Sequence, residues 1–382
     1  MISRFALAAG LAVLMVVSSV GSYMYLGSRQ SDLTAPPQVP TAVTPSPGAF
    51  NLSGTLFLTQ SGAIFSLSAG RFHQLTSEAG WTQLALYPGN NLLAVKRNLL
   101  FSDVYILSRF GKVLRKLTSN TAPAGNPDTG ARHWSFYPRL SHNQKTLFMS
   151  YDKPKAGFDV PMTIWAMPIG KPISQATRWT TAIDYTGGDM QPLPLPSGAL
   201  MYTKFLYYNQ RIVSQIWITN KPEQQYYCGA FCITVPPGPD HGTPLTAPDE
   251  DCSQPSLSPN GKAIAMICTH ETQVSYLALA AFNGHTLGPR RNLITNQLVA
   301  QPTWAPDSSG IAYLAPAQLG SGFQLWWLPK GAFALPSATP TPTPTPGAPT
   351  PTPSPVAPVS NKPVQMTTNL GFDATSPMAW IP

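Results

Sequence analysis

The chain of 382 residues contains 42 prolines and 29 glycines, which favour turns and extended segments and argue against a helical bundle. Apolar residues make up 43% of the sequence and charged residues only 10%, so the chain can fill a large core and is not a solvated disordered polymer. The formal net charge is +8, but the basic residues occur singly or in pairs such as Arg290 and Arg291. Composition therefore excludes a nucleic-acid-binding stripe and predicts a sizeable globular domain.

The first 27 residues predict a membrane anchor or a signal segment. Residues 5–26 carry no charge, and a helix of that length spans about 33 Å, enough for a hydrocarbon core of about 30 Å. Arg4 and the amino terminus precede this run, which places the short N-terminus in the cytoplasm. The run is longer than a signal-peptide core and no Ala-x-Ala site follows it, which favours a single-pass anchor over a cleaved signal. Both alternatives place the rest of the chain outside the cytoplasm, tethered to a bacterial-type membrane or secreted.

Two proline-rich stretches follow. Residues 28–51 contain five prolines and little apolar bulk, which predicts an extended linker. Residues 336–358 contain ten prolines with many threonines, which is typical of polyproline II or disorder. The simplest interpretation of this second stretch is a spacer.

An internal repeat lies between the linkers. Each copy has a strand ending in Pro-x-Trp/Leu-x-Pro, a turn with Asn, Asp or Gly, a strand containing Ile/Leu-Ala, an aromatic strand and a strand ending in Leu-Thr. Clear copies begin at Pro255 and Pro302, and weaker ones at Leu84, Pro138 and Pro192. Apolar alternation with β-branched and aromatic residues predicts strands. Four strands in each copy correspond to the blade of a β-propeller.

The two termini complete a sixth blade. Residues 56–76 supply three strands with no first strand before them, and Trp380-Ile381-Pro382 matches Trp304-Ala305-Pro306. The C-terminal residues are therefore expected to form the innermost strand of the blade that begins at residue 54. The predicted fold is all-β, a six-bladed β-propeller of four-stranded blades over residues 52–382, closed by the N- and C-terminal strands. Residues 336–358 become an insertion within the blade that begins at Pro302.

The copy Pro-Thr-Trp-Ala-Pro-Asp-Ser-Ser-Gly-Ile-Ala at Pro302 resembles the repeat Pro-x-Trp-Ser-Pro-Asp-Gly-x-x-Ile-Ala of TolB-type, WD-repeat-like six-bladed propellers. The resemblance covers residues 52–382. It implies binding of a protein partner through one face of the ring or the mouth of its channel. The sequence departs from the pattern at Pro377, which lies one residue further from Trp380 than Pro302 lies from Trp304, so the local register there stays open.

An even number of cysteines in an oxidising compartment predicts disulfides. The four cysteines are Cys228, Cys232, Cys252 and Cys268, which allow three connectivities. A hairpin that turns about Asn260 places Cys252 opposite Cys268, and Gly229 allows Cys228 to approach Cys232. These two pairs are preferred, and the other pairings stay open. Neither pair has the CxxC spacing of a zinc site, so no metal is predicted.

No catalytic motif is found. The sequence lacks a nucleophile elbow, an HExxH helix, a Walker loop and a GxGxxG loop, and no residues remain for an α/β-hydrolase domain beside the propeller. The six histidines lie singly in different strands and loops, where a surface or hydrogen-bonded role is the better explanation. No catalytic residue and no cofactor is therefore predicted, although the ring of oligogalacturonate lyases shows that a propeller can itself hold a metal and a base.

One polar position recurs just before the proline of each copy, occupied by Gln83, Tyr137, Gln191, Gln254 and Gln301. Either each amide ties its strand to a neighbouring blade, which is favoured because buried amides usually bond backbone groups, or the set forms an amide-rich channel mouth that binds a peptide or glycan. Further candidate binding residues lie in the loops that enter the inner strands, and these are Arg132, His133, Asp189, Asp251 and Asp373. These loop residues are expected on one face of the ring.

The leading hypothesis is a membrane-tethered extracytoplasmic propeller that binds a protein, peptide or envelope glycan as a scaffold or recognition module. The alternative is a metal-assisted polysaccharide lyase or hydrolase on the same fold. An enzyme requires two or more histidines or carboxylates that converge in the channel, whereas a binding module requires only an exposed aromatic or amide-rich face. A third possibility is a propeller that only spaces an envelope complex.

Overall fold

The structure is a computed structural model that describes residues 52–122, 129–153, 155, 160–222, 242–269, 274–295, 297–333 and 362–382. The predicted anchor and linker at residues 1–51, the pair Cys228 and Cys232, and the proline-rich insertion at 336–358 lie outside these residues. Within the described ranges, the search for a helix long and apolar enough to cross a membrane finds none.

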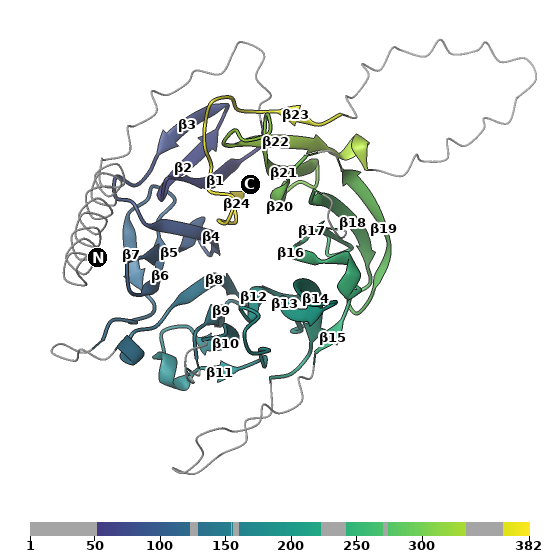
Figure 1. The fold of residues 1–382 in the computed structure, drawn as a ribbon. Coiled ribbons are helices and arrows are strands. Elements are labelled where there is room, and N and C mark those ends of the chain that lie inside the picture. The colour runs from purple at the N-terminus through teal and green to yellow at the C-terminus, as the bar shows by residue number, and fades with distance from the viewer. Residues whose placement is uncertain are drawn as a thin grey trace, which may run out of the picture. The chain divides into compact units, whose positions relative to one another are not determined.

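Six four-stranded antiparallel sheets form the blades, arranged in a ring (Figure 1). From the inner to the outer strand, the first blade contains β24 (Ala379–Ile381), β1 (Thr55–Gln60), β2 (Ala63–Ser68) and β3 (Arg71–Gln74). The second contains β4 (Trp81–Tyr87), β5 (Asn91–Arg97), β6 (Ser102–Leu107) and β7 (Val113–Lys116). The third contains β8 (Ser135–Leu140), β9 (Thr146–Tyr151), β10 (Thr163–Pro168) and β11 (Thr177–Arg178). The fourth blade contains β12 (Asp189–Pro194), β13 (Leu200–Tyr208), β14 (Arg211–Thr219) and β15 (Thr243–Pro244). The fifth contains β16 (Cys252–Leu257), β17 (Ala263–Cys268), β18 (Tyr276–Phe282) and β19 (Leu287–Ile294). The sixth contains β20 (Ala300–Trp304), β21 (Gly310–Pro316), β22 (Phe323–Pro329) and β23 (Val364–Gln365). The predicted six-bladed propeller is confirmed.

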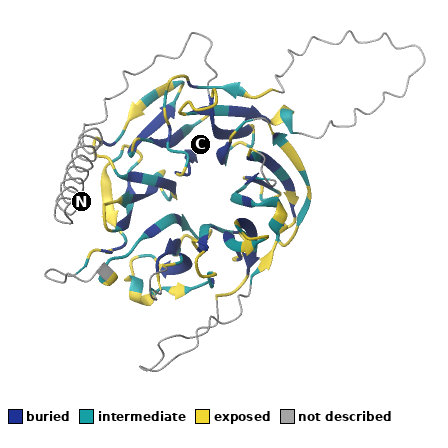
Figure 2. Cartoon of the chain, viewed as in Figure 1, coloured by how far each residue is buried: buried dark blue, intermediate teal, exposed yellow. Residues whose placement is uncertain are grey.

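Burial follows the radial position of each strand (Figure 2). All seven residues of β21 are buried, whereas all four residues of the outer strand β7 are exposed. Neighbouring blades cover both faces of a middle strand, so such strands are apolar throughout rather than alternating. The outer strands face water on one edge and carry the polar residues.

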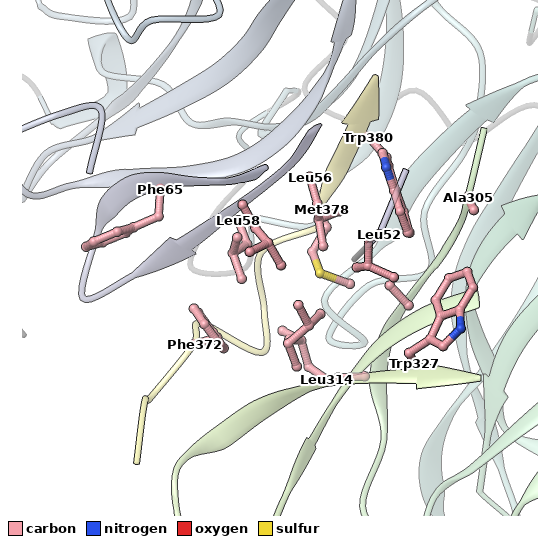
Figure 3. Close-up of a cluster of buried hydrophobic side chains, with 14 of the residues drawn as sticks. Leu52, Leu56, Leu58, Phe65, Ala305, Leu314, Trp327, Phe372, Met378 and Trp380 are labelled. Carbon is pink, nitrogen blue, oxygen red and sulfur yellow. The ribbon is translucent and has the colours of Figure 1, made fainter. Parts of the chain in front are cut away.

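The C-terminal strand closes the ring as predicted. β24 pairs with β1 so that Trp380 lies opposite Leu56, and the chain ends there on the inner side of the first blade. Leu56, Met378 and Trp380 pack against Leu314 and Trp327 of the sixth blade in one buried cluster (Figure 3). Closure of the ring therefore rests on apolar contacts between the two ends of the chain as well as on strand pairing.

The outer strand of the sixth blade comes after the proline-rich stretch in the sequence. Trp326 of β22 pairs with Gln365 of β23, and these two strands flank residues 336–358 along the chain. The chain therefore returns to the same sheet after that stretch, which is the arrangement expected for an insertion within this blade.

The Leu-Thr ending of the repeat has a structural role. In five blades a threonine hydroxyl just after the outer strand accepts a hydrogen bond of 2.9–3.0 Å from a backbone N–H of the third strand. These threonines are Thr76, Thr118, Thr180, Thr246 and Thr367. Each hydroxyl satisfies a buried donor at the point where the outer strand leaves the sheet.

One predicted disulfide is present. Cys252 of β16 lies directly opposite Cys268 of β17, with the Cα atoms 4.0 Å apart, and their sulfurs are bonded. Both cysteines are buried. The hairpin geometry about Asn260 is therefore confirmed.

Candidate functional site

The inner strands share a β-bulge at the recurring polar position. The strand register shifts there in β4, β8, β12, β16 and β20. The bulged residues are Gln83, Tyr137, Gln191, Gln254 and Gln301, with φ between 52° and 57°. A positive φ is costly for residues other than glycine, by about 1–3 kcal/mol, and persists only where surrounding interactions favour it. Proline follows four of the five, which a bulge tolerates because the proline has no N–H to contribute to the ladder.

Hydrogen bonds link bulged residues of neighbouring inner strands around the channel. The backbone N–H of Tyr137 donates to Gln83 Oε1 at 2.8 Å, that of Gln254 to Gln191 Oε1 at 2.8 Å, and that of Gln301 to Gln254 Oε1 at 2.6 Å. Burial raises the pKa of the Tyr137 hydroxyl. At the closing blade, the N–H of Gln83 donates to Ser376 Oγ at 2.7 Å and Gln301 Nε2 donates to the carbonyl of Ala374 at 2.8 Å.

Three amides thus tie adjacent blades, as the favoured interpretation predicts, because Gln83, Gln191 and Gln254 each accept a bond from the bulged N–H of the next inner strand. Gln301 instead bonds the carbonyl of Ala374, in the segment that leads to β24. Ser376, which was not predicted from the sequence, takes this position in the first blade with a hydroxyl in place of an amide. Its signal was its place immediately before Pro377, which parallels Gln301 before Pro302.

A cavity of about 500 Å³ lies at the carboxyl ends of the inner strands. Tyr137, Gln191, Gln254 and Gln301 contribute to its wall. The rest of the lining is mainly proline and apolar, and comprises Ala85, Leu86, Arg139, Leu140, Pro192, Leu193, Pro255, Ser256, Leu257, Pro259, Pro302, Thr303, Trp304, Pro306, Pro377, Met378, Ala379, Trp380 and Pro382. The cavity reaches the surface, because Leu86 is 47% exposed and both Pro259 and Pro382 are exposed.

Two tryptophans form fixed parts of the cavity wall. The indole N–H of Trp304 donates to the carbonyl of Ser256 at 3.0 Å, and that of Trp380 to the carbonyl of Ser53 at 2.8 Å. Their rings are therefore held in place beside the prolines of the wall before any ligand arrives. A concave, mostly apolar site with a few polar groups, within the usual range of about 300–1,000 Å³, is the common form of a ligand pocket.

Arg139 is the one charged side chain in this lining. Its Nη1 donates to the carbonyls of Leu84 at 2.9 Å and Pro138 at 3.2 Å. Burial lowers the pKa of the guanidinium to about 10, so it remains protonated at neutral pH. Arg139 was not predicted as a site residue, because a single arginine beside Pro138 belongs to no recurring pattern.

The other six candidate residues do not line the cavity, and of these Gln83 belongs to the bulged set. Arg132, His133, Asp189, Asp251 and Asp373 are at or just before the amino ends of inner strands, whereas the cavity lies at their carboxyl ends. The ten candidates thus form two separate sets rather than one channel mouth. Of the loop set, none contributes to the cavity wall.

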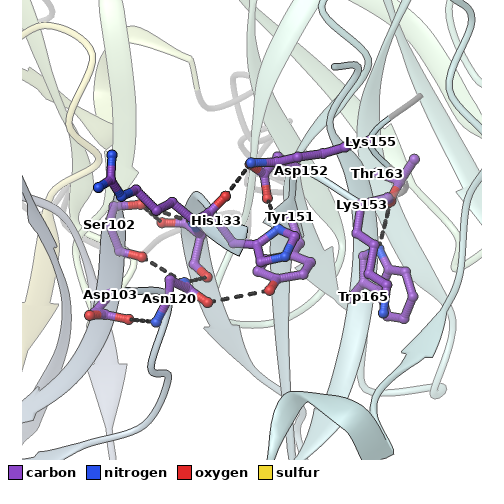
Figure 4. A network of polar contacts seen from close by, with 12 residues as sticks. Ser102, Asp103, Asn120, His133, Tyr151, Asp152, Lys153, Lys155, Thr163 and Trp165 are labelled. Carbon is purple, nitrogen blue, oxygen red and sulfur yellow. Dashed lines mark hydrogen bonds and ion pairs between the residues drawn. The ribbon is translucent and has the colours of Figure 1, made fainter. Parts of the chain in front are cut away.

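His133 belongs to a polar network between the second and third blades (Figure 4). Its Nδ1 lies 2.8 Å from Asp152 Oδ1, and Lys155 Nζ lies 3.0 Å from Asp152 Oδ2. The His133 ring stacks on Tyr151 with the centroids 5.0 Å apart, and Lys155 Nζ also donates to the carbonyl of Arg132. Asp152 was not found from the sequence, because it follows a buried strand without any motif.

The remaining candidate carboxylates also have protein partners. Asp189 Oδ1 lies 3.2 Å from Lys204 Nζ, and Asp251 Oδ1 accepts from both the N–H and the hydroxyl of Ser214 at 2.7 Å. The carboxylate of Asp373 accepts from the N–H groups of Ser61 and Gly62, each at 3.1 Å. These contacts hold loops and strand ends. Across the described ranges, histidines, cysteines and carboxylates do not gather in any group of three that could hold a metal ion.

The comparisons with known proteins show the fold. No family model and no curated protein sequence matches the chain. TolB from Acinetobacter baumannii is similar with a TM-score of 0.50 and 16% identity over 74% of this chain and 63% of that one. A putative TolB from Agrobacterium tumefaciens is similar with a TM-score of 0.51 and 12% identity over 87% of this chain and 100% of that one. A periplasmic gluconolactonase from Pseudomonas aeruginosa is also similar, with a TM-score of 0.44 and 11% identity over 72% of this chain and 79% of that one. The chain spans less than two thirds of the Acinetobacter protein, and the architecture is that of TolB-type six-bladed propellers.

Proposed function

We propose that this chain is a membrane-tethered, extracytoplasmic recognition module that binds an extended segment of a protein or peptide of the cell envelope. The membrane tether rests on the apolar run at residues 5–26, and the compartment on that run together with the buried disulfide between Cys252 and Cys268. The similarity to TolB structures supports the fold on which this proposal builds.

The observation that carries the proposal is the cavity at the carboxyl ends of the inner strands. Its wall combines prolines, the fixed rings of Trp304 and Trp380, and amide groups from the hydrogen-bonded ring. Apolar surfaces of this kind bind extended peptide side chains, and amides pair with peptide backbone groups. An envelope glycan would bond the same amides, and photo-crosslinking distinguishes a glycan ligand from a peptide.

The enzyme alternative receives less support from this cavity. Acid–base or metal-assisted cleavage of a polysaccharide needs converging carboxylates or histidines. No side chain among the described residues of the cavity wall is either of these, and its single charged side chain is that of Arg139. Asp152 and His133 do form a pair, but at the other end of the inner strands, where Lys155 also bonds the carboxylate.

Site-specific photo-crosslinking of the full chain in intact cells tests the proposal. A photoreactive amino acid at Leu86, which is 47% exposed on the rim of the cavity, is expected to give a discrete adduct whose mass identifies the partner. The matched control places the same amino acid at Leu114, which is 51% exposed on the outer strand β7. Identical adducts from both positions, or none from Leu86, would contradict recognition at the cavity. A glycan adduct at Leu86 would show that the ligand of the cavity is a sugar and not a peptide.

A further inference from the structure

Arg139 has unused hydrogen-bonding capacity inside the central cavity. A guanidinium has five N–H donors, and the two contacts of Arg139 with backbone carbonyls both come from Nη1. Among the residues that the structure describes, no carboxylate oxygen lies within 4.0 Å of a guanidinium nitrogen of Arg139, so Arg139 forms no ion pair there. The Nε and Nη2 groups therefore remain available to a ligand.

Arg139 is only partly buried, and it carries its charge without a counter-ion among the described residues. Its contacts with carbonyls satisfy N–H groups without neutralising the charge. Water supplies no fixed counter-charge, whereas a carboxylate can accept two parallel N–H groups from one guanidinium. The site is thus complementary to a planar anion.

The surroundings favour a carboxylate that belongs to a peptide. The apolar walls formed by prolines, Trp304 and Trp380 lower the local dielectric and strengthen an ion pair there. The side-chain NH2 of Gln254 also lines the cavity and has no hydrogen-bond partner among the described residues, so it can bond a peptide carbonyl. The cavity offers one positive charge, one free amide donor and apolar surface.

We propose that Arg139 binds a peptide carboxylate within the cavity, supplied by the peptide's C-terminus or by an Asp or Glu side chain. This inference rests on the proposed function and specifies the chemistry of its ligand. The two sources share the same chemistry at Arg139, and the experiment distinguishes them.

Affinity selection provides the test, with the full chain in lipid nanodiscs and three libraries of N-acetylated pentapeptides. One library has a free C-terminal carboxylate, one is amidated and uncharged, and one is amidated with a single Asp or Glu. Mass spectrometry of captured peptides is expected to show at least about tenfold enrichment of one carboxylate-bearing library over the uncharged one, because charge-assisted hydrogen bonds are about twice as strong as neutral ones. Whichever acidic library is enriched identifies the source of the carboxylate.

Two variants complete the design. Arg139→Gln is expected to abolish the enrichment, while Arg71→Gln, which removes the same charge from the exposed outer strand β3, is expected to retain it. Thermal unfolding without peptide checks folding, and R139Q is expected to keep a single cooperative transition, because the substitution removes an unpaired charge together with two hydrogen bonds to carbonyls.

Three results would overturn the inference. Equal capture of all three libraries would leave peptide binding standing and remove the role of Arg139. Capture of no library by the wild-type chain would contradict the proposed function as well. Loss of enrichment in R139Q together with a lowered unfolding temperature and an equal loss for the uncharged library would assign Arg139 a structural role.

Discussion

The backbone N–H of Gln301 donates to the side-chain oxygen of Gln254 at 2.6 Å, joining the inner strands of two blades. Both residues have φ of 54°, so the same bulge that exposes the N–H of one directs the amide of the other toward the next blade. Repetition of this contact around the channel explains why amides recur at this position. The bond between Gln254 and Gln301 stabilises the structure, and the same two side chains also form a polar part of the cavity wall.

Replacement of Gln254 by leucine is expected to destabilise the propeller. The variant leaves the N–H of Gln301 without its acceptor, which costs about 1–3 kcal/mol in free energy of unfolding. Denaturant unfolding measures the change. Gln175→Leu is the control, because Gln175 is exposed and is expected to change stability by less than about 0.5 kcal/mol. Equal stability of Q254L and wild type would show that the ring bond contributes nothing to folding.

Removal of the Trp380 side chain is expected to weaken closure of the ring. Trp380 is 4% exposed, its indole N–H bonds Ser53, and its ring contacts Trp327 with the centroids 5.7 Å apart. Trp380→Ala should lower the free energy of unfolding by about 3–5 kcal/mol. Thermal or denaturant unfolding measures this loss, with Leu319→Ala as the fully exposed control. A loss no larger than that of the control would mean that β24 does not close the propeller.

Stability is expected to fall above pH 10 because of buried tyrosines. Burial raises the pKa of Tyr313 and Tyr151 in the folded state, whereas an unfolded tyrosine ionises near a pKa of about 10. At pH values between the pKa of the unfolded tyrosine and the raised pKa of the folded one, the folded protein keeps protons that the unfolded chain releases. The free energy of unfolding therefore decreases as pH rises, by up to about 1.4 kcal/mol per pH unit for each tyrosine.

The variant Tyr313→Phe isolates this effect. Its stability at pH 7 reports the loss of the bond from Gln297 Nε2 to the hydroxyl, 3.2 Å long in the wild type. Its slope between pH 10 and 12 reports titration alone, and is expected to be shallower than that of wild type. An unchanged slope would show that Tyr313 does not hold its proton in the folded state.

The disulfide between Cys252 and Cys268 is expected to be oxidised in intact cells. Closing a loop with a separation of 16 residues stabilises the fold by about 3 kcal/mol, and cytosolic thiols would be kept reduced. Alkylation of living cells before lysis, followed by peptide mass spectrometry, measures the redox state. Alkylated Cys252 and Cys268 would contradict the extracytoplasmic location. Purified Cys252→Ala/Cys268→Ala protein should unfold at a lower temperature than wild type.

The sequence by itself was sufficient for the architecture, because each blade is built from local pairings. The Pro-x-Trp and Leu-Thr endings marked strand ends, the match of Trp380 to Trp304 identified the closing strand, and the hairpin about Asn260 placed Cys252 opposite Cys268. Neighbouring strands within a blade are separated by short turns, so their pairing follows from spacing along the chain.

The tertiary structure alone decided which groups share a site. Arg139 lines the same cavity as Gln254 and Gln301 only because inner strands of separate blades converge around one axis. It also separated the loop residues, such as His133, from the cavity, by placing the two ends of the inner strands on opposite sides. These relations depend on the curvature and closure of the whole ring, which no local pattern of residues encodes, so the charge in the cavity could not be found from the sequence.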